Sequence, residues 1–238
     1  MKRAVVLLTL VTLALGAPTA AGAHDLWLES GANGWQLKCG HRPGGHGGAT
    51  TLPLPPERIL AATALVATGD TLGLPLTAAR AGNWPATAPA LLVVTSSGVW
   101  TRGTEGTRNL PPSAVAHPLA SWRSVESVKG IASWLPALAR PLTRWLELVP
   151  TSDPLRVAAG DKLGLIAYRE GRPVPGVTVA YAGETRGVTD AEGRINIRLR
   201  QSGFQHIQAS LELPLAGDEA DKLIETTALD FLLPEPVR

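Results

Sequence analysis

Two stretches near the start of the chain carry the side chains best suited to metal chemistry. The first is His24-Asp25, which follows the small-residue sequence Ala21-Gly22-Ala23. Cleavage after Ala23 would make His24 the first residue of the mature protein, so that its α-amine and ring Nδ1 could chelate one ion. Neutral imidazole suits nickel, copper, zinc and iron, and the α-amine loses its proton near neutral pH. The alternative is a terminal histidine without function, because any residue can follow a cleavage site.

The second stretch is the glycine-rich segment 40–48, which contains His41 and His46. Little side-chain bulk separates the two rings, so the backbone can fold to bring both to one ion. Together with His24 they form the predicted metal site. The alternative for this segment is a flexible polar loop whose histidines are solvated.

Three further residues are candidate ligands. Asp25 offers a carboxylate, and Cys39 offers a soft thiolate that suits copper(I) or nickel. Because Cys39 is the only cysteine, it forms no internal disulfide, and its alternative is a buried, inert thiol. His117 precedes Pro118 in a predicted loop, where a surface histidine without a metal is the alternative.

Strands must position these residues. His24 to Ser30 alternates between apolar and polar residues, a turn follows at residues 31–34, and Trp35 to Cys39 alternates again. This pattern predicts a hairpin that brings the mature N-terminus alongside the loop after Cys39.

Most of the remaining chain has the pattern of short strands. Twenty prolines and twenty-five glycines indicate many turns. Residues 90–95 and 98–101 are predicted as two strands around a turn at 96–98. In contrast, residues 121–134 are predicted as a short amphipathic helix, because apolar residues recur there at intervals of three.

A domain boundary is predicted near residues 149–150, where two prolines bracket polar residues. Beyond it, strands recur every 8 to 12 residues or so with turn signals between them, which is typical of a small immunoglobulin-like sandwich. The predicted fold class is mainly β. It comprises a β-sandwich-like domain over residues 24–149, with the metal site and the short helix, and an immunoglobulin-like domain over residues 150–238.

Residues 1–23 have the pattern of a secretory signal. Lys2 and Arg3 precede an apolar run from Ala4 to Leu15, which is too short to span a bilayer. No later run is long enough, so the mature chain is predicted to be periplasmic and to lack a transmembrane segment. The formal charge of +2 falls to about zero without Lys2 and Arg3, which gives nucleic-acid binding no electrostatic support.

Several motifs together resemble one bacterial family, that of uncharacterised periplasmic proteins associated with nickel and cobalt uptake. The resemblance covers nearly the whole mature chain. It is carried by His24-Asp25-Leu26-Trp27-Leu28-Glu29, Gly40-His41-Arg42 with His46, Gly98-Val99-Trp100-Thr101 with Glu105-Gly106, Leu146-Glu147-Leu148-Val149-Pro150 with Asp153-Pro154, Gly160-Asp161-Lys162-Leu163, Gly187-Val188-Thr189-Asp190 with Gly193, and Asp221-Lys222.

The resemblance implies a two-part β protein whose second part is similar to the immunoglobulin-type modules of carboxypeptidase-regulatory and collagen-adhesin proteins. It also implies metal ligands at His24, His41 and His46. His206 stands where relatives are expected to carry an apolar residue, so it is left outside the predicted site.

The predicted function is therefore a periplasmic accessory protein that captures a divalent transition metal, with nickel or cobalt favoured and copper possible. Its partner would be a metal transporter or an outer-membrane receptor of the cell envelope. Two alternatives stay open: a copper-binding protein or copper mono-oxygenase that uses the terminal histidine, and a structural or adhesion module that binds no metal. Phosphate-loop, serine-hydrolase and His-Glu-x-x-His motifs are absent from the sequence, so the chain is not predicted to be an enzyme.

Overall fold

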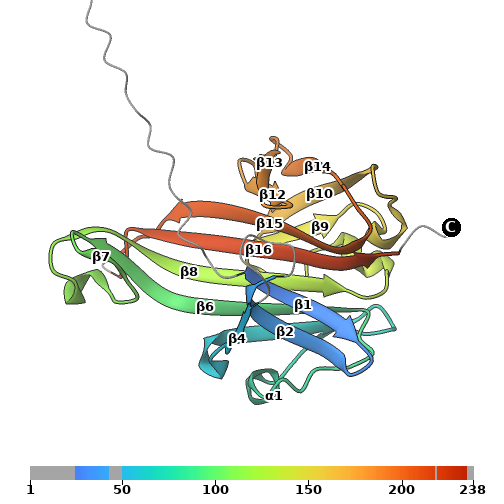
Figure 1. The fold of residues 1–238 in the computed structure, drawn as a ribbon, viewed down its shortest axis with the longest axis horizontal. Coiled ribbons are helices and arrows are strands. Elements are labelled where there is room, and N and C mark those ends of the chain that lie inside the picture. The colour runs from blue at the N-terminus through green and yellow to red at the C-terminus, as the bar shows by residue number, and fades with distance from the viewer. Residues whose placement is uncertain (1–24, 43–49, 218, 235–238) are drawn as a thin grey trace, which may run out of the picture.

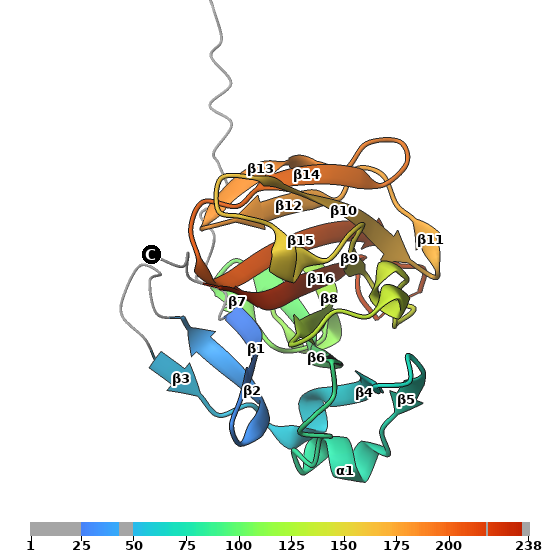
Figure 2. The ribbon, with the colours of Figure 1, turned by 90° about the vertical axis from the view of Figure 1, so that its right-hand side faces the viewer.

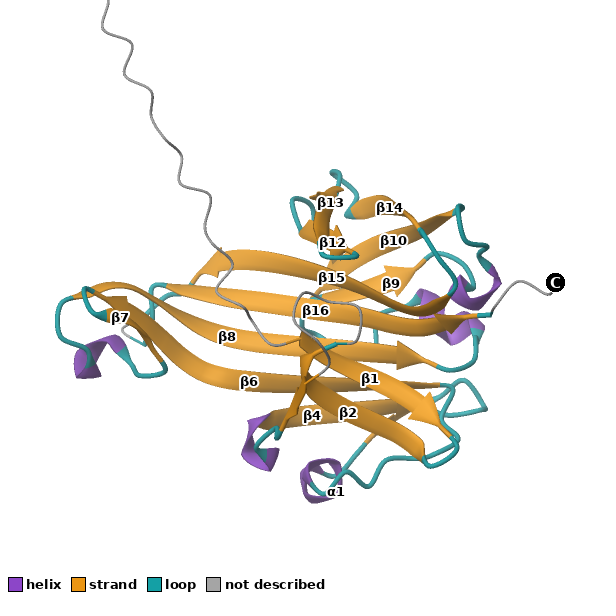
Figure 3. Cartoon of the chain, in the orientation of Figure 1, coloured by secondary structure: helices purple, strands orange, loops and turns teal. Residues whose placement is uncertain are grey.

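The computed structural model describes residues 25–42, 50–217 and 219–234, and these residues form a mainly β protein of the sandwich type (Figures 1 and 3). The predicted fold class is thereby confirmed. The strands are β1 (Asp25–Gly31), β2 (Gly34–His41), β3 (Thr50–Leu52), β4 (Ile59–Leu65), β5 (Thr71–Gly73), β6 (Ala90–Gly103), β7 (Gly106–Arg108), β8 (Pro118–Ile131), β9 (Glu147–Pro150), β10 (Lys162–Arg169), β11 (Arg172–Pro173), β12 (Thr178–Tyr181), β13 (Glu184–Val188), β14 (Arg194–Arg198), β15 (Gly203–Pro214) and β16 (Lys222–Leu233). The helical segments are α1 (Leu76–Arg80) and the 3-10 turns η1 (Pro56–Arg58), η2 (Pro112–Ala114), η3 (Pro136–Ala139) and η4 (Pro154–Arg156).

A nine-stranded sheet runs through the middle of the molecule. Its strand order is β13-β12-β15-β16-β8-β6-β4-β5. The ninth strand, β7, pairs with β6 outside this order. Neighbouring strands are antiparallel except β16 and β8, which are parallel. A four-stranded sheet of β9, β10, β11 and β14 and a three-stranded sheet of β1, β2 and β3 complete the described part of the chain.

The two smaller sheets cover opposite faces of the large one (Figure 2). The four-stranded sheet packs on β12, β15 and β16 through a core that includes Leu165, Val179 and Leu229. The three-stranded sheet packs on the other face through a second core that includes Leu28 and Val128. Because both faces of the large sheet are covered, its central strands contain consecutive buried residues, such as Leu91, Leu92, Val93 and Val94 of β6.

The predicted hairpin is confirmed for the described residues. β1 and β2 pair from Asp25 opposite Gly40 to Gly31 opposite Gly34. Inward-facing Trp35 anchors the hairpin: its Nε1 donates to the Ala88 carbonyl at 3.1 Å, and its ring lies directly over Gly130 of β8. The start of β1 therefore has a fixed position over the central sheet.

Residues 121–134 do not form the predicted helix, because residues up to Ile131 belong to β8. Alternate residues of a strand share a face, so Val128 packs towards the hairpin, whereas Val125 and Ile131 pack on the opposite side. Pairing with β6 on one side and β16 on the other satisfies the backbone of β8, and local spacing contains no information about these distant partners.

Residues 90–103 form one long strand, β6, where two strands and a turn were predicted. The predicted turn is a bulge, since the register with β8 shifts between Ser96 and Gly98. A bulge admits an extra residue without ending the strand, so turn-forming residues there did not reverse the chain.

The predicted domain boundary falls within β9. Strands from both sides of it share the nine-stranded sheet, since β15 and β16 continue the sheet that β4, β6 and β8 begin. A buried hydrogen bond also joins the two parts, because Ser127 Oγ of β8 donates to Thr227 Oγ1 of β16 at 2.8 Å. The division into two domains itself stays a prediction.

Candidate functional site

Asp25 opens β1 and is held by two other elements. Its Oδ1 accepts a hydrogen bond from Gln208 Nε2 of β15 at 3.0 Å, and its Oδ2 accepts one from Arg42 Nε, also at 3.0 Å. The first contact spans 183 residues of sequence. The start of β1 is therefore attached both to its own hairpin and to the central sheet.

Glu126 of β8 supplies a second carboxyl group, and the negative charge of Asp25 acts on it. Burial, together with the negative charge of Asp25, raises the pKa of Glu126 to about 7. A cation would stabilise a buried carboxylate that has a second negative charge acting on it.

Cys39 borders these carboxyl groups. The thiol is half-buried on the inner face of β2, beside Leu26. Burial raises the pKa of Cys39, and the charges of Glu126 and Asp25 add to that rise, whereas Arg58 opposes it. In the absence of a metal, the thiol is therefore held in its protonated form.

A buried histidine–aspartate pair lies on the neighbouring strands. His206 of β15 faces Asp230 of β16 in register, with 2.6 Å between Nδ1 and Oδ1, and both side chains are almost completely buried. The other oxygen of Asp230 accepts a hydrogen bond from the Leu28 amide of β1 at 2.8 Å. Asp230 thus links the edge of β1 to the imidazole.

The remaining ring nitrogen, His206 Nε2, is buried without a hydrogen-bond partner among the residues that the structure describes. Burial raises the pKa of Asp230, and the neighbouring His206 opposes that rise. The contact with Asp230 occupies Nδ1, so Nε2 is the ring nitrogen that is left without a partner among the described residues.

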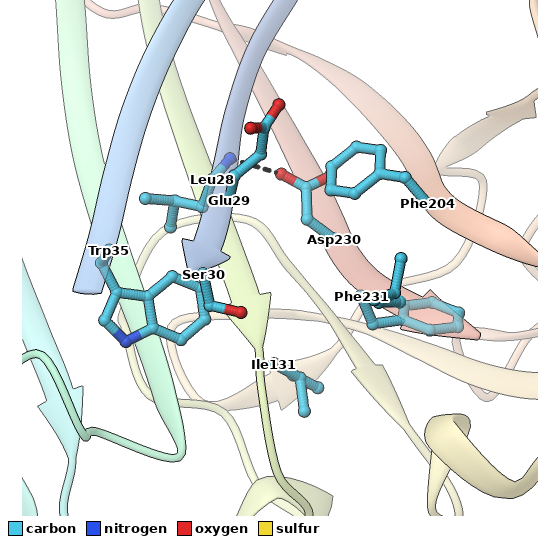
Figure 4. Close-up of a pocket in the computed structure, with 9 residues that line it drawn as sticks. Leu28, Glu29, Ser30, Trp35, Ile131, Phe204, Asp230 and Phe231 are labelled. Atoms are coloured by element: carbon cyan, nitrogen blue, oxygen red, sulfur yellow. Dashed lines mark hydrogen bonds between the residues drawn. The ribbon is translucent and has the colours of Figure 1, made fainter. Parts of the chain in front are cut away.

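A cavity of about 270 Å³ opens beside this pair (Figure 4). It lies between the end of β1, the start of β2, the start of β15 and the end of β16. Trp35, Phe204 and Phe231 supply apolar walls, and Asp230 contributes its polar group. The carboxyl group of Asp230 points towards Leu28 at one side of this cavity (Figure 4).

Of the predicted ligands, the structure brings Asp25 and Cys39 into one neighbourhood. His41 ends β2 opposite Thr50 of β3, two residues after Cys39 and on the same face. His24 and His46 lie outside the described residues.

His117 lies elsewhere. It is exposed, adopts a positive φ of 49°, and directly precedes β8. Along β8, Pro118 and Glu126 are eight residue steps apart, which corresponds to a distance of roughly 26 Å. The structure therefore does not bring His117 to Asp25.

Within the described ranges, no three side chains of histidine, cysteine, aspartate or glutamate form a group able to hold a metal ion. Sequence reasoning also missed Glu126, His206 and Asp230. A signal for the pair was present: His206 and Asp230 are the only titratable residues in the predicted strands 204–211 and 226–231, and a titratable residue that a strand buries needs a partner.

The family model described as "Domain of unknown function (DUF4198)" matches residues 21–213. The chain belongs to this family. No curated protein and no solved structure matches it. Among the described residues, the structure contains no helix with the length and apolar character needed to cross a membrane.

Proposed function

We propose that this protein binds a divalent transition metal in the periplasm and supports its uptake, with nickel or cobalt as the preferred cargo. The observation that carries the proposal is the effect of the negative charge of Asp25, at the start of β1, on the buried carboxyl group of Glu126. A divalent cation between them would relieve this repulsion. It would also draw on Cys39 and on His41 at the end of β2.

His24 and His46 complete the proposed ligand set. His24 directly precedes Asp25 in the sequence, and cleavage after Ala23 would add its α-amine to the donors. A mixed set of amine, imidazole and carboxylate ligands suits nickel and cobalt. Because the Irving–Williams order places copper(II) above both, the cargo would be selected by supply and by the partner, a transporter or receptor of the cell envelope.

Calorimetry on the exported, processed protein tests this proposal. We expect about one Ni²⁺ or Co²⁺ ion per chain, and we expect His24→Ala combined with His41→Ala to abolish binding. N-terminal sequencing of the same sample checks that cleavage follows Ala23.

His117→Ala is the matched control, because it removes an exposed histidine far from Asp25 and should leave binding intact. An unchanged stoichiometry in the double variant, or no metal uptake by the processed wild type, would overturn the proposal.

A further inference from the structure

We propose that the outer face of the four-stranded sheet docks on the surface of an anionic lipid bilayer. This sheet lies on the side of the molecule away from the β1–β2 hairpin (Figures 1 and 2). The inference therefore goes beyond the proposed metal binding and does not depend on it. The inner face of the sheet packs in the core through Leu163 and Ile197, so the residues that alternate with these point outward.

The outer face of this sheet carries basic side chains. Lys162 of β10 and both Arg194 and Arg198 of β14 stand on it and are exposed. Neither β10 nor β14 contains an acidic residue. In the described strands of the sheet, the single acidic residue is Glu147 of β9, which is completely buried and pairs with Lys129. The sheet itself therefore supplies no acidic side chain that balances the charge of its outer face.

These cations also lack ion pairs with the rest of the described chain. Their one hydrogen bond within the described ranges runs from the Arg198 side chain to the Gly160 carbonyl. The strand register places Lys162 directly opposite Arg198. Side chains opposite each other on neighbouring strands have Cβ atoms roughly 5 Å apart, and like charges in that position are destabilising. A partner that brings negative charge to this face would offset the repulsion.

The spacing of the cations favours an extended anionic surface over a small anion. Arg194 and Arg198 are four residue steps apart along β14, which corresponds to roughly 13 Å. A single phosphate or carboxylate group cannot contact both side chains across that distance. A bilayer of anionic lipids presents many negative groups in one plane, and each Lys or Arg near that plane adds to the attraction.

The uncharged residues of the same face favour lipid over a soluble polyanion. Ile166 and Tyr168 stand on the outer face of β10, and both side chains are half-buried. A tyrosine suits the headgroup level of a membrane, where its ring meets apolar groups and its hydroxyl meets water. Basic side chains extend their apolar stems through the same level and keep their charge at the surface. Attraction to a soluble polyanion would make no use of the isoleucine.

Co-sedimentation of the exported, processed protein with lipid vesicles tests the inference. The vesicles contain either phosphatidylcholine alone or phosphatidylcholine mixed with phosphatidylglycerol, which is anionic. We expect binding to the mixed vesicles only, and we expect it to weaken as salt rises, because salt screens exposed charges. Lys162→Gln combined with Arg194→Gln should weaken this binding by roughly 25-fold, since each basic residue at an anionic surface contributes roughly fivefold.

Arg102→Gln combined with Arg108→Gln is the matched control, because it removes the same charge from exposed residues of β6 and β7. The midpoint of urea unfolding, measured for both double variants, checks that they fold as the wild type does. Equal binding to the two kinds of vesicle, an unchanged affinity in the first double variant, or an equal loss in the control would overturn the inference. Binding to dextran sulfate without binding to the mixed vesicles would also overturn it, because the partner would then be a soluble polyanion.

Discussion

At the scale of single residues, the start of β1 gathers polar groups that an apolar sheet would normally exclude. Asp25 is held by Arg42 and Gln208, whereas Glu126 has burial and a like charge acting on it. Burial without a compensating charge disfavours ionisation. Protonation of the Glu126 carboxyl group is therefore coupled to folding and, in the proposed function, to metal binding.

The free energy of unfolding should depend on pH through the protonation of Glu126. The pKa of Glu126 is about 7 in the folded protein and about 4.3 in an unfolded chain, so the folded state binds the proton more tightly. The free energy of unfolding contributed by Glu126 should therefore fall as the pH rises from about 4.3 to 7, by about 4 kcal/mol in total. Glu126→Gln should remove this part of the pH dependence when urea unfolding is measured at pH 5 and pH 8.

Glu105→Gln is the control for that measurement, since Glu105 is exposed and pairs only with the exposed Arg108 among the described residues. A Glu126→Gln variant with the same pH dependence as the wild type would contradict the expectation.

At the scale of elements, the site depends on how the β1–β2 hairpin docks on β8. The docking needs a residue without a side chain at position 130, because a Cβ atom there would collide with the ring of Trp35 and would stand 3.0 Å from the Cβ of Leu28. Gly130 is thus a point of close approach between the hairpin and the central sheet. A glycine within a strand commonly marks such an approach.

Gly130→Ala should displace Trp35 and destabilise the protein by about 1–3 kcal/mol, the usual cost of overpacking a well-filled core. The loss is measured as a lower midpoint of urea unfolding with an unchanged slope. Gly31→Ala is the matched control within the hairpin, since an added Cβ there meets no atom within 4 Å. Equal midpoints for the two variants would show that the hairpin does not depend on this contact.

At the scale of the whole molecule, the central sheet joins the two ends of the chain. The parallel pairing of β16 with β8 places residues 222–231 beside residues 122–131. A buried hydrogen bond from Ser127 Oγ of β8 to Thr227 Oγ1 of β16 adds a side-chain contact between the same two strands. Removing one part would expose a long strand edge of the other, which is unfavourable in water.

Unfolding should therefore be a single cooperative transition. The sequence provides separate probes, because all seven tryptophans precede residue 150 and both tyrosines follow it. Tryptophan fluorescence and tyrosine absorbance, recorded on the same urea series, should give coincident curves. Two separated midpoints would instead indicate that the parts unfold independently.

The sequence predicted local features better than distant ones. The alternation in residues 24–30 and 35–39 predicted the hairpin, because strand period and turn residues act over a few positions. The same kind of reasoning failed at residues 121–134, where a spacing of three resembled a helix. The strand there is stabilised by partners at residues 90–103 and 222–231, which no local window contains.

The sequence by itself determined the mainly β fold class, the hairpin of β1 and β2 and the gathering of candidate metal ligands near it, since each follows from composition or short-range pattern. Only the tertiary structure brought Glu126, Gln208 and the His206–Asp230 pair to the start of β1. These residues lie about 100 to 200 positions from Asp25, and the order of strands within a sheet decides which of them meet. That order is set by the packing of whole apolar faces, a property that is distributed over the chain and has no local signature.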